Sequence, residues 1–379
     1  MTDSLASRSL FAGTDGLAYL NTAAEGLAPA VFADALAAYA RDKALGSDGR
    51  TGMLAVEQRC RERAAALLST EPAEVAFVTS CARGINAALS ALHLERGDVL
   101  VTTDLEFPTT DVAAVRLRDS GVEVRIARSA GGGVSPHAVT ALLDERVRAV
   151  VVSLVSFKTG ALLDLAPVSA ACRAAGALLV VDATQALGVV PVQAALADVV
   201  VASGFKWLLG AHGVAVMYVR AGAVAGLEPE AVGWRSIVDP FADILATGVD
   251  LAPDARRFEE GMPPFPSLYA LDAGLELLAH YDPAEVAAHA RTLVGQLRDE
   301  LTARGLAPLG PGVEAERAGI VSIADDRAEE HTAALRERGV VVWGRDGRLR
   351  ASVHLYNDSS DIDRLLEALP STMLLRRSA

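Results

Sequence analysis

Lysine is scarce in this chain of 379 residues, which contains only Lys43, Lys158 and Lys206. Nearly all of its 35 basic residues are therefore arginines, and 48 acidic residues give a formal net charge of −13. A large negative charge repels nucleic acid and anionic membranes, so we expect neither as a partner. A lysine in an apolar setting must be explained in such a chain, because burying its charge is costly.

Cysteine is also rare, and long apolar runs are missing. Cys60, Cys81 and Cys172 are widely spaced and form no Cys-x-x-Cys pair. This disfavours a disulfide framework and a zinc site, so we expect no metal, and it fits a reducing cytoplasm. The first residues do not resemble a signal peptide, and no apolar run reaches the ~18 residues of a membrane span. We expect a soluble, cytoplasmic protein.

Short apolar segments alternate with helical patterns through the middle of the chain. Most apolar segments are hydrophobic on both faces, which is typical of buried parallel strands. Repeated strand–helix units predict an α/β fold with a mostly parallel sheet flanked by helices, and with ligands at the carboxyl ends of the strands. Strands are expected at 75–77, 98–102, 123–126, 149–154, 178–181, 198–202 and 214–219, with helices at 56–68, 84–92, 111–120, 135–144 and 166–174.

The pattern changes after about residue 222. A stretch rich in Gly, Pro and Asp predicts long loops up to residue 266, and a weaker α/β tail follows. We place a large domain at 21–255 and a smaller domain at 1–20 and 256–379, because Tyr19 to Asn21 looks like a strand that joins the second domain. In the tail we expect helices at 267–280, 283–304 and 360–369, the last capped by Asp358, and strands at 319–324, 340–343 and 349–353.

Two ionisable residues stand at the carboxyl ends of predicted strands. Lys206 follows the run 198–202, and Asp182 follows the run 178–181. Burial lowers the pKa of an amine and makes it nucleophilic, as a Schiff-base lysine requires. A carboxylate beside it would keep a pyridinium nitrogen protonated. A surface lysine is the alternative, but the scarcity of lysine and the position of Asp182 favour a pyridoxal phosphate (PLP) site.

Other residues could complete such a site. Residues 79–86 follow a strand and open a helix, so their unpaired amides predict an anion cradle, with the Ser203 hydroxyl as a further donor. The same turn could be only a helix cap. Phe107 could lie over a pyridine ring or be a core residue beside a turn. Gln185 could donate to the phenolic oxygen of the cofactor or simply begin a helix.

The chain resembles the class V aminotransferase family in seven segments that occur in the same order. This group of fold type I PLP enzymes includes cysteine desulfurases, kynureninases and isopenicillin N epimerase-like proteins. The resemblance covers nearly the whole chain and is specific for the family, though not for a reaction. It implies PLP as the cofactor and the PLP-dependent transferase fold of type I. The segments are SCARGIN, LEFPTTD, VSFKTG, VVDATQALG, SGFKWLLGAHG, RFEEG and LRASVHLYNDSSDID.

The resemblance also implies roles in binding the cofactor. Lys206 would be the catalytic residue that bonds covalently to PLP, and Asp182 would pair with the pyridine nitrogen. Gln185 would contact the phenolic oxygen, and Phe107 would stack on the ring. The phosphate would be held by Ser203 and by the backbone of Cys81 and Ala82.

For the substrate, the resemblance implies a small-molecule amino acid. Arg350 matches the arginine that grips the α-carboxylate through a bidentate fork, although it could be a surface arginine on an edge strand. Asn21 and Phe157 are expected beside it. Residues 258–264 resemble the segment that a second subunit contributes to its neighbour's phosphate site, which implies a homodimer with a shared active site.

The chain departs from cysteine desulfurases at several positions. Those enzymes carry a nucleophilic cysteine shortly before the carboxylate-binding arginine, and this chain has no cysteine after Cys172. Phe107 and Phe205 stand where desulfurases have histidines, and Met262 stands where a threonine often reaches the phosphate. Persulfide chemistry is therefore not expected.

The reaction depends on which Cα bond the protein activates, and the sequence leaves that open. We favour carbon–sulfur β-elimination of a cysteine S-conjugate, because walls formed by Phe107, Phe157 and Phe205 suit a bulky thioether better than a dicarboxylate. An aminotransferase, or an epimerase, of a small or secondary-metabolite amino acid is the alternative. A PLP-binding protein without catalysis is disfavoured by the intact Lys206, and a nicotinamide-binding enzyme by the lack of a GxGxxG segment. Lys158 could bind a second carboxylate or be solvated.

Overall fold

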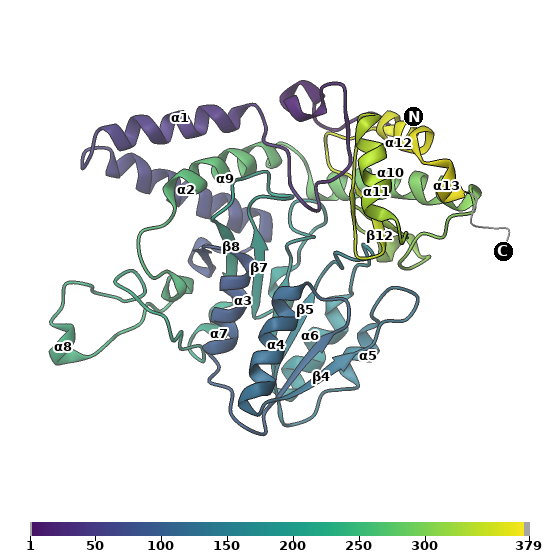
Figure 1. The fold of residues 1–379 in the computed structure, drawn as a ribbon. Coiled ribbons are helices and arrows are strands. Elements are labelled where there is room, and N and C mark those ends of the chain that lie inside the picture. The colour runs from purple at the N-terminus through teal and green to yellow at the C-terminus, as the bar shows by residue number, and fades with distance from the viewer. Residues whose placement is uncertain (1, 375–379) are drawn as a thin grey trace.

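The computed structural model describes residues 2–374, and its centre is a seven-stranded sheet (Figure 1). The strand order is β2-β8-β7-β6-β5-β3-β4. Strand β8 runs antiparallel to both of its neighbours, and the other pairs are parallel. The strands are β2 (Val75–Val78), β3 (Val99–Thr103), β4 (Glu123–Ala127), β5 (Val147–Ser153), β6 (Leu178–Asp182), β7 (Val199–Ser203) and β8 (Ala215–Val219).

The predicted mostly parallel α/β sheet is confirmed, and all seven strands lie within two residues of the expected positions. Strands β2, β3, β7 and β8 are buried along their whole length, as continuous apolar runs require. Strand β4 is half exposed because it forms the edge of the sheet. The pairing of β5 with β6 sets Ser153 beside Asp182, so both side chains lie on one face at the carboxyl ends of the strands.

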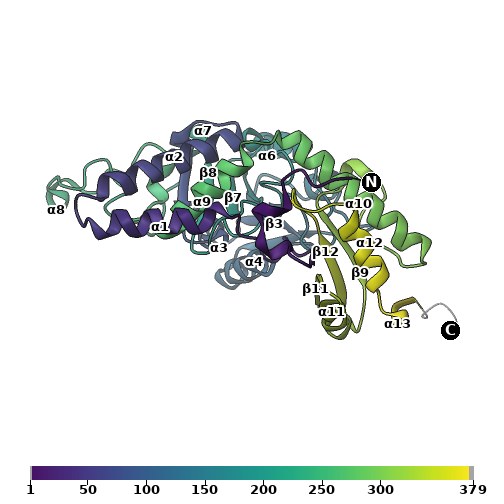
Figure 2. The same ribbon diagram turned by 90° about the horizontal axis from the view of Figure 1, so that it is seen from above.

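Helices cover both faces of this sheet. Helix α6 (Leu165–Ala175) packs with one face of the strands, and α3 (Cys81–Ser90) and α4 (Pro108–Ser120) pack with the other (Figure 2). Each begins near the carboxyl end of a strand with its own start signal: Ser80 caps α3, Pro108 opens α4 and Asp164 caps α6. Helix α5 (Pro136–Thr140) is shorter than expected, and a short 3₁₀ turn, η4 (Ala194–Leu196), precedes β7.

A helical layer extends beyond one end of the sheet. Helix α1 (Val31–Ala44), which has no counterpart among the expected elements, and α2 (Arg50–Leu68) both contact α9 (Phe265–Leu278). Helix α7 (Ala221–Val224) follows β8, and the loop region predicted at 233–266 holds α8 (Ile244–Thr247) and η5 (Ala255–Phe258). Figures 1 and 2 show α8 standing well away from the sheet, on a loop closed by a bridge between Ile237 and Leu251.

The C-terminal part carries a second, antiparallel sheet. Its order is β11-β12-β9, with β9 (Ile320–Ala324), β11 (Trp343–Arg345) and β12 (Arg348–Ser352). The strand expected at 340–343 is split, because β10 (Val340–Val341) pairs with β1 (Ala18–Tyr19) while Trp343 pairs with Arg350. Around these strands lie α10 (Pro283–Ala303), α11 (Ala328–Glu337), α12 (Ser359–Ala368) and α13 (Ser371–Leu374).

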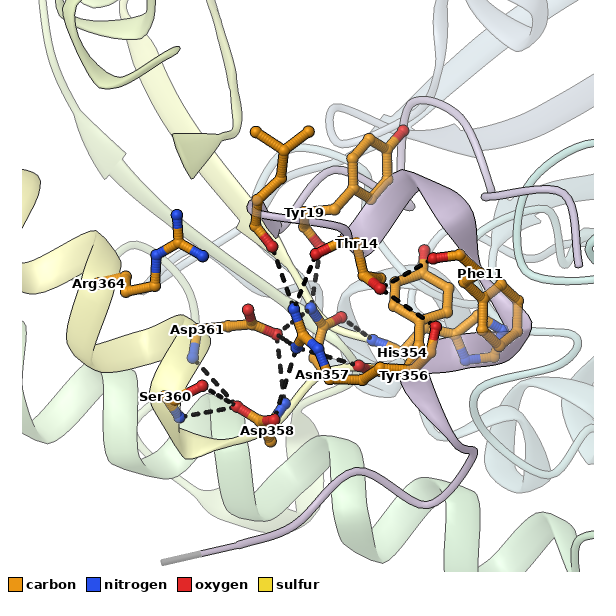
Figure 3. Close-up of polar contacts among 12 residues, drawn as sticks. Phe11, Thr14, Tyr19, His354, Tyr356, Asn357, Asp358, Ser360, Asp361 and Arg364 are labelled. Atoms are coloured by element: carbon orange, nitrogen blue, oxygen red, sulfur yellow. Dashed lines mark hydrogen bonds and ion pairs between the residues drawn. The ribbon is translucent and has the colours of Figure 1, made fainter. Parts of the chain in front are cut away.

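The first residues lie against this C-terminal part, as Tyr19 and its neighbours suggested. Asn357 donates to the Tyr19 carbonyl at 2.9 Å and to Asp361 Oδ2 at 2.8 Å, and Asp358 caps α12 as expected (Figure 3). Arg8 donates to the same Asp361 oxygen at 2.7 Å.

The division into domains at residues 20 and 255 stays a prediction. Among residues 2–374, none of the helices is both long and apolar enough to cross a membrane.

Candidate active site

A cavity of about 190 Å³ lies at the carboxyl ends of β5, β6 and β7. Its position is the one where open α/β sheets bind ligands. Eight of the ten site residues expected from the sequence line this cavity, and Arg350 and Asn21 lie outside its lining. The eight are Cys81, Ala82, Phe107, Phe157, Asp182, Gln185, Ser203 and Lys206.

The Lys206 side chain is only 8% exposed and points among aromatic rings. Its Nζ lies 5.5 Å from the centre of the Phe107 ring and 5.6 Å from that of Phe205. Burial lowers the pKa of the amine from 10.5 to about 8, and the Asp182 carboxylate acts in the opposite direction. The amine is therefore partly neutral at mildly alkaline pH, which a nucleophile requires.

The backbone around Lys206 is held by a close contact with Gly26. The Gly26 N–H donates to the Phe205 carbonyl at 3.0 Å. A Cβ atom at position 26 would lie 2.0 Å from the Lys206 carbonyl oxygen, which no real structure tolerates. Glycine is therefore needed at position 26 for the chain to pass so close to the lysine.

Asp182 ends β6 and is buried in the wall of the same cavity. Its Oδ1 accepts a hydrogen bond from the Thr184 N–H at 2.8 Å. The Thr184 hydroxyl in turn accepts from the Ser203 N–H at 3.3 Å, which ties the ends of β6 and β7 together. Asp182 and Lys206 thus face one crevice from neighbouring strand ends, as their positions in the sequence predicted.

The start of helix α3 lies beside these two residues. Helix α3 begins at Cys81, and the Ser80 hydroxyl accepts from the Arg83 N–H at 3.1 Å. The first-turn amides of an α-helix, here those of Cys81 and Ala82, have no partner within the helix. They stand at the positive end of the helix dipole, where anions are stabilised. Ser80 and Ser203 line the cavity next to them.

Three phenylalanines shape the remaining wall. Phe107 is 41% exposed, so it is no core residue, and its ring meets that of Phe157 edge to face at 5.1 Å. Pro108 fixes the turn behind it as the first residue of α4. Phe205 stacks on His212 with ring centres 4.2 Å apart. The predicted apolar wall of Phe107, Phe157 and Phe205 is therefore present in the cavity.

Gln185 lines the cavity, and part of its amide is already engaged. Its Nε2 donates to the Ala23 carbonyl at 3.0 Å, and its Oε1 accepts from Trp207 Nε1 at 2.8 Å. A primary amide has two N–H donors, so one donor remains for a ligand.

Arg350 lies behind Phe157 and is 4% exposed. Its Nη1 donates to the Phe157 carbonyl at 3.0 Å, and its buried Nε has no partner among the described residues. Burial, and then the nearby Arg348, lower the pKa of Arg350 to about 10. Because β12 is the middle strand of its sheet, the interpretation of Arg350 as a surface residue on an edge strand is wrong.

Asn21 lies near Arg350 in the fold. It forms a bridge with Ser352, two residues beyond Arg350 on the same strand. The Asn21 Oδ1 atom is buried and has no hydrogen-bond partner among the described residues. Arg350 and Asn21, the two expected residues outside the cavity lining, thus each have a buried polar atom without a hydrogen-bond partner among the described residues.

Several lining residues escaped the sequence analysis as individual candidates. Ser153 could have been found, because it lies near the carboxyl end of the strand predicted at 149–154, and in the structure it pairs with Asp182. Thr184 has no such signal, since its contact depends on the turn after β6. The lining residues in this group are Ser80, Thr109, Ser153, Val155 and Thr184.

A larger hollow of about 770 Å³ lies elsewhere, between residues 130–136, 161–165, 191–196 and 311–316. It shares no lining residue with the Lys206 cavity, and its lining includes Asp164 and Glu316 but no described lysine, arginine or histidine. The smaller cavity is the candidate active site, because it contains a buried amine and a buried carboxylate. Such ionisable groups indicate a functional site more strongly than the volume of a cavity does. No group of three or more metal-binding side chains gathers among residues 2–374.

The groups in the smaller cavity fit PLP. The cofactor has an aldehyde, a ring nitrogen, a phosphate and a flat aromatic face. The cavity offers the Lys206 amine, the Asp182 carboxylate, the start of α3 and the exposed ring of Phe107, each from a separate element. Bound PLP supplies a sink for the electron pair left when a bond to Cα breaks.

Comparison with known proteins decides the family. The family described as Aminotransferase class-V matches residues 18–365. The chain belongs to the class V aminotransferase family. As a member of this family it is a PLP-dependent enzyme, so the predictions of the family, the cofactor and the enzyme class are confirmed. The match to this family spans both the large sheet and the C-terminal sheet.

Relatives within the family differ in the activities that their names state. An uncharacterised aminotransferase, YcbU of Bacillus subtilis, is 28% identical over 82% of each chain. A cysteine desulfurase of Cronobacter sakazakii is 28% identical over 93% of this chain and 92% of its own. Since the two names differ, they do not decide the reaction.

Solved structures agree with the fold. The apo cysteine desulfurase of Thermococcus onnurineus has a TM-score of 0.86 and 23% identity, covering 95% of both chains. A complex of the cystine C–S lyase C-DES with cysteine persulfide also has a TM-score of 0.86 and 23% identity, covering 94% of this chain and 98% of that one. The expected PLP-dependent transferase fold of type I is thereby confirmed.

Proposed function

We propose that this PLP-dependent enzyme cleaves the carbon–sulfur bond of a cysteine S-conjugate by β-elimination. The observation that carries the proposal is the aromatic wall of Phe107, Phe157 and Phe205 around a buried amine, without a thiol that can attack sulfur. Overall, one water is consumed, and the conjugate yields a free thiol, pyruvate and ammonia.

The proposed roles in holding PLP follow the positions of the residues. Lys206 would bond to the aldehyde, Asp182 would pair with the ring nitrogen, and Phe107 would cover one face of the ring. Gln185 would donate its remaining N–H to the phenolic oxygen. The phosphate would be bound by Ser203 and by the backbone amides of Cys81 and Ala82.

In catalysis, the amine of Lys206 would move protons. With a pKa of about 8 it can accept the proton from Cα at neutral to alkaline pH. The same proton can then pass to the sulfur as the Cβ–S bond breaks and its electron pair leaves with sulfur. Arg350, with its open Nε, would hold the α-carboxylate, and Asn21 and Phe157 would border the substrate.

The three thiols are unsuited to persulfide chemistry. Cys60, Cys81 and Cys172 are all buried, and only Cys81 touches the cavity within the described structure. Burial raises the pKa of each thiol, so little thiolate is present at neutral pH. Sulfur transfer to an enzyme cysteine is therefore disfavoured, whereas elimination needs no such residue.

An aminotransferase is the second candidate, favoured by the name of the relative YcbU. The same residues would serve it, because both reactions begin by removing the proton from Cα. The difference lies in the products: a transferase passes the amino group to a keto acid and releases no thiol.

We further propose that the enzyme is a homodimer with a shared active site. Residues 258–264 carry Met262, which is 39% exposed, and the neighbouring loop presents Phe241 and Leu245 almost fully to solvent. Exposed apolar side chains of this size suit a subunit contact. Sedimentation of the wild type and of Phe241→Asp tests this, and a monomeric wild type would refute it. The cytoplasmic location stays a prediction from the sparse, unpaired thiols.

The deciding experiment incubates the PLP-loaded enzyme with a panel of cysteine S-conjugates and follows pyruvate and free thiol together. Equal release of both, lost in Lys206→Ala, is the expected result. Amino-group transfer to a keto acid without any thiol would instead establish the aminotransferase.

A further inference from the structure

Three basic side chains gather around Phe157, which lines the candidate active site. Lys158 Nζ and Arg348 Cζ each lie 5.7 Å from the centre of the Phe157 ring. Arg350 donates to the Phe157 carbonyl from below. One of the three lysines of an acidic chain thus stands with two arginines beside the candidate active site.

These cations form no ion pair within the described part of the chain, although Asp346 acts on Arg348, and Asp111 on Lys158, from a greater distance. Among residues 2–374, no carboxylate lies within ion-pair distance of Lys158, Arg348 or Arg350, whereas Arg8, Arg61, Arg125 and Arg235 each have one. Lys158 donates to the carbonyl of Asp104 at 2.8 Å, which fixes its direction without neutralising it. Charges removed from water are normally paired, so this cluster is suited to an anion that the protein itself does not supply.

The backbone explains why the two arginines act together. Arg348 and Arg350 are two residues apart on β12, so their side chains project from the same face of the strand. Both lie over the Trp343 ring of β11, at 5.9 Å for Arg348 and 4.9 Å for Arg350. The indole holds both guanidinium groups by cation–π contact while leaving their N–H donors available.

The cluster also has a defined place relative to Lys206. Lys206 lies over the ring of Phe107, Phe107 meets Phe157 edge to face, and Arg348 lies over the ring of Phe157. A substrate whose Cα sits at Lys206 would reach Arg348 only with a side chain that passes along these rings. With one α-carboxylate bound to Arg350, Arg348 and Lys158 still have no carboxylate within ion-pair distance among residues 2–374.

We propose that the substrate carries a second acidic group at the far end of its side chain, bound by Arg348 and Lys158 beyond Phe157. This rests on the proposed function, and it narrows the substrate to cysteine S-conjugates with an anionic S-substituent. The thioether contacts Phe107 and Phe157, and the terminal carboxylate meets the cations. The released thiol is then a mercapto acid, and the apolar wall and the charged cluster each bind one part of it.

The test measures binding separately from turnover. S-carboxyethyl-cysteine and S-carbamoylethyl-cysteine have nearly the same shape and differ in the charge of the terminal group. Calorimetry uses PLP-loaded Lys206→Ala protein, which lacks the amine that removes the Cα proton. In this background the dissociation constant should be about tenfold lower for the carboxylate, since one charge-assisted hydrogen bond contributes about this much. Arg348→Met and Lys158→Met should each reduce the preference for the carboxylate while leaving the affinity for the amide unchanged.

The matched control is Arg345→Met. Arg345 pairs with Arg348 in the sheet, but it is exposed and contacts Glu329, so its loss should leave the preference intact. Equal affinity for the acid and the amide in the wild type, no binding of either, or an unchanged preference in Arg348→Met would each overturn the inference.

The outcome is distinguishable from a failure of the proposed function. If the carboxylate conjugate binds preferentially through Arg348 but neither thiol nor pyruvate appears, the lyase proposal fails and the acidic-substrate inference holds. In that case the protein should also bind glutamate more tightly than glutamine in the same calorimetric experiment. If thiol is released equally from both conjugates with equal affinity, the lyase proposal holds and the inference fails.

Discussion

The Glu106 carboxylate accepts a hydrogen bond at 2.6 Å from the hydroxyl of Ser153, which lines the candidate active site. The Ser153 N–H and the Thr103 hydroxyl donate to the other oxygen at 3.0 and 2.7 Å. Glu106 is 1% exposed and precedes Phe107, while Ser153 pairs with Asp182 across the sheet. A buried acid without a described basic partner thus links two walls of the cavity.

Glu106→Gln is expected to change how stability depends on pH. Burial raises the pKa of Glu106 from 4.5 to about 7, so the folded state holds this proton more tightly than the unfolded state. Its contribution is fully present below pH 4.5 and is lost as the pH rises through 7. Glutamine mimics the protonated form, so the variant should gain about 2–3 kcal/mol relative to the wild type between acidic and neutral pH.

Urea unfolding of both cofactor-free proteins across this range measures the difference. Glu285→Gln, at an exposed position near the start of α10, serves as the control and should follow the wild type within about 0.5 kcal/mol. Parallel stability curves for Glu106→Gln and the wild type would contradict the prediction.

The rate at which cofactor-free protein captures PLP should rise with pH and level off just above pH 8. Only the neutral amine attacks an aldehyde, and burial lowers the pKa of Lys206 from 10.5 to about 8. Stopped-flow absorbance across this range gives the profile. Lys206→Met retains Lys43 and Lys158, so any PLP capture that remains in this variant measures the reaction at lysines outside the cavity. A wild-type rate that keeps rising to pH 10.5 would show that the amine is not desolvated.

Native protein should react very slowly with a thiol reagent at neutral pH. Cys60, Cys81 and Cys172 are buried, and burial raises the pKa of each thiol. Titration with a chromogenic disulfide should detect all three thiols only after denaturation. A thiol that reacts within seconds in the native protein would reopen the possibility of persulfide chemistry.

Arg350→Met should weaken amino-acid binding by about 10- to 100-fold, because a charge-assisted contact to the α-carboxylate is lost. Calorimetry with the PLP-loaded enzyme measures the change, and Arg345→Met is again the control. The same variant should bind an amine that lacks the carboxylate as well as the wild type does. Unchanged amino-acid affinity in Arg350→Met would place the carboxylate elsewhere.

Local sequence signals predicted most of the sheet and the positions of Asp182 and Lys206 in the site. Apolar runs located the seven strands, since buried parallel strands must be hydrophobic on both faces. Asp182 and Lys206 could be placed in one crevice because parallel strands end at the same edge of a sheet. Helix α1 was missed, and none of its residues is fully buried, so it lacks the continuous apolar face that marks a core helix.

The family, the cofactor and the strand-end residues could be predicted without coordinates, because they depend on local patterns and ordered motifs. The fold was needed to show that Arg350 is buried, that Glu106 accepts a hydrogen bond from Ser153, and that Lys158 and Arg348 both lie over Phe157. Lys158 and Arg348 are far apart in the chain. The charge around a side chain depends on what the fold brings beside it, and no local pattern encodes that.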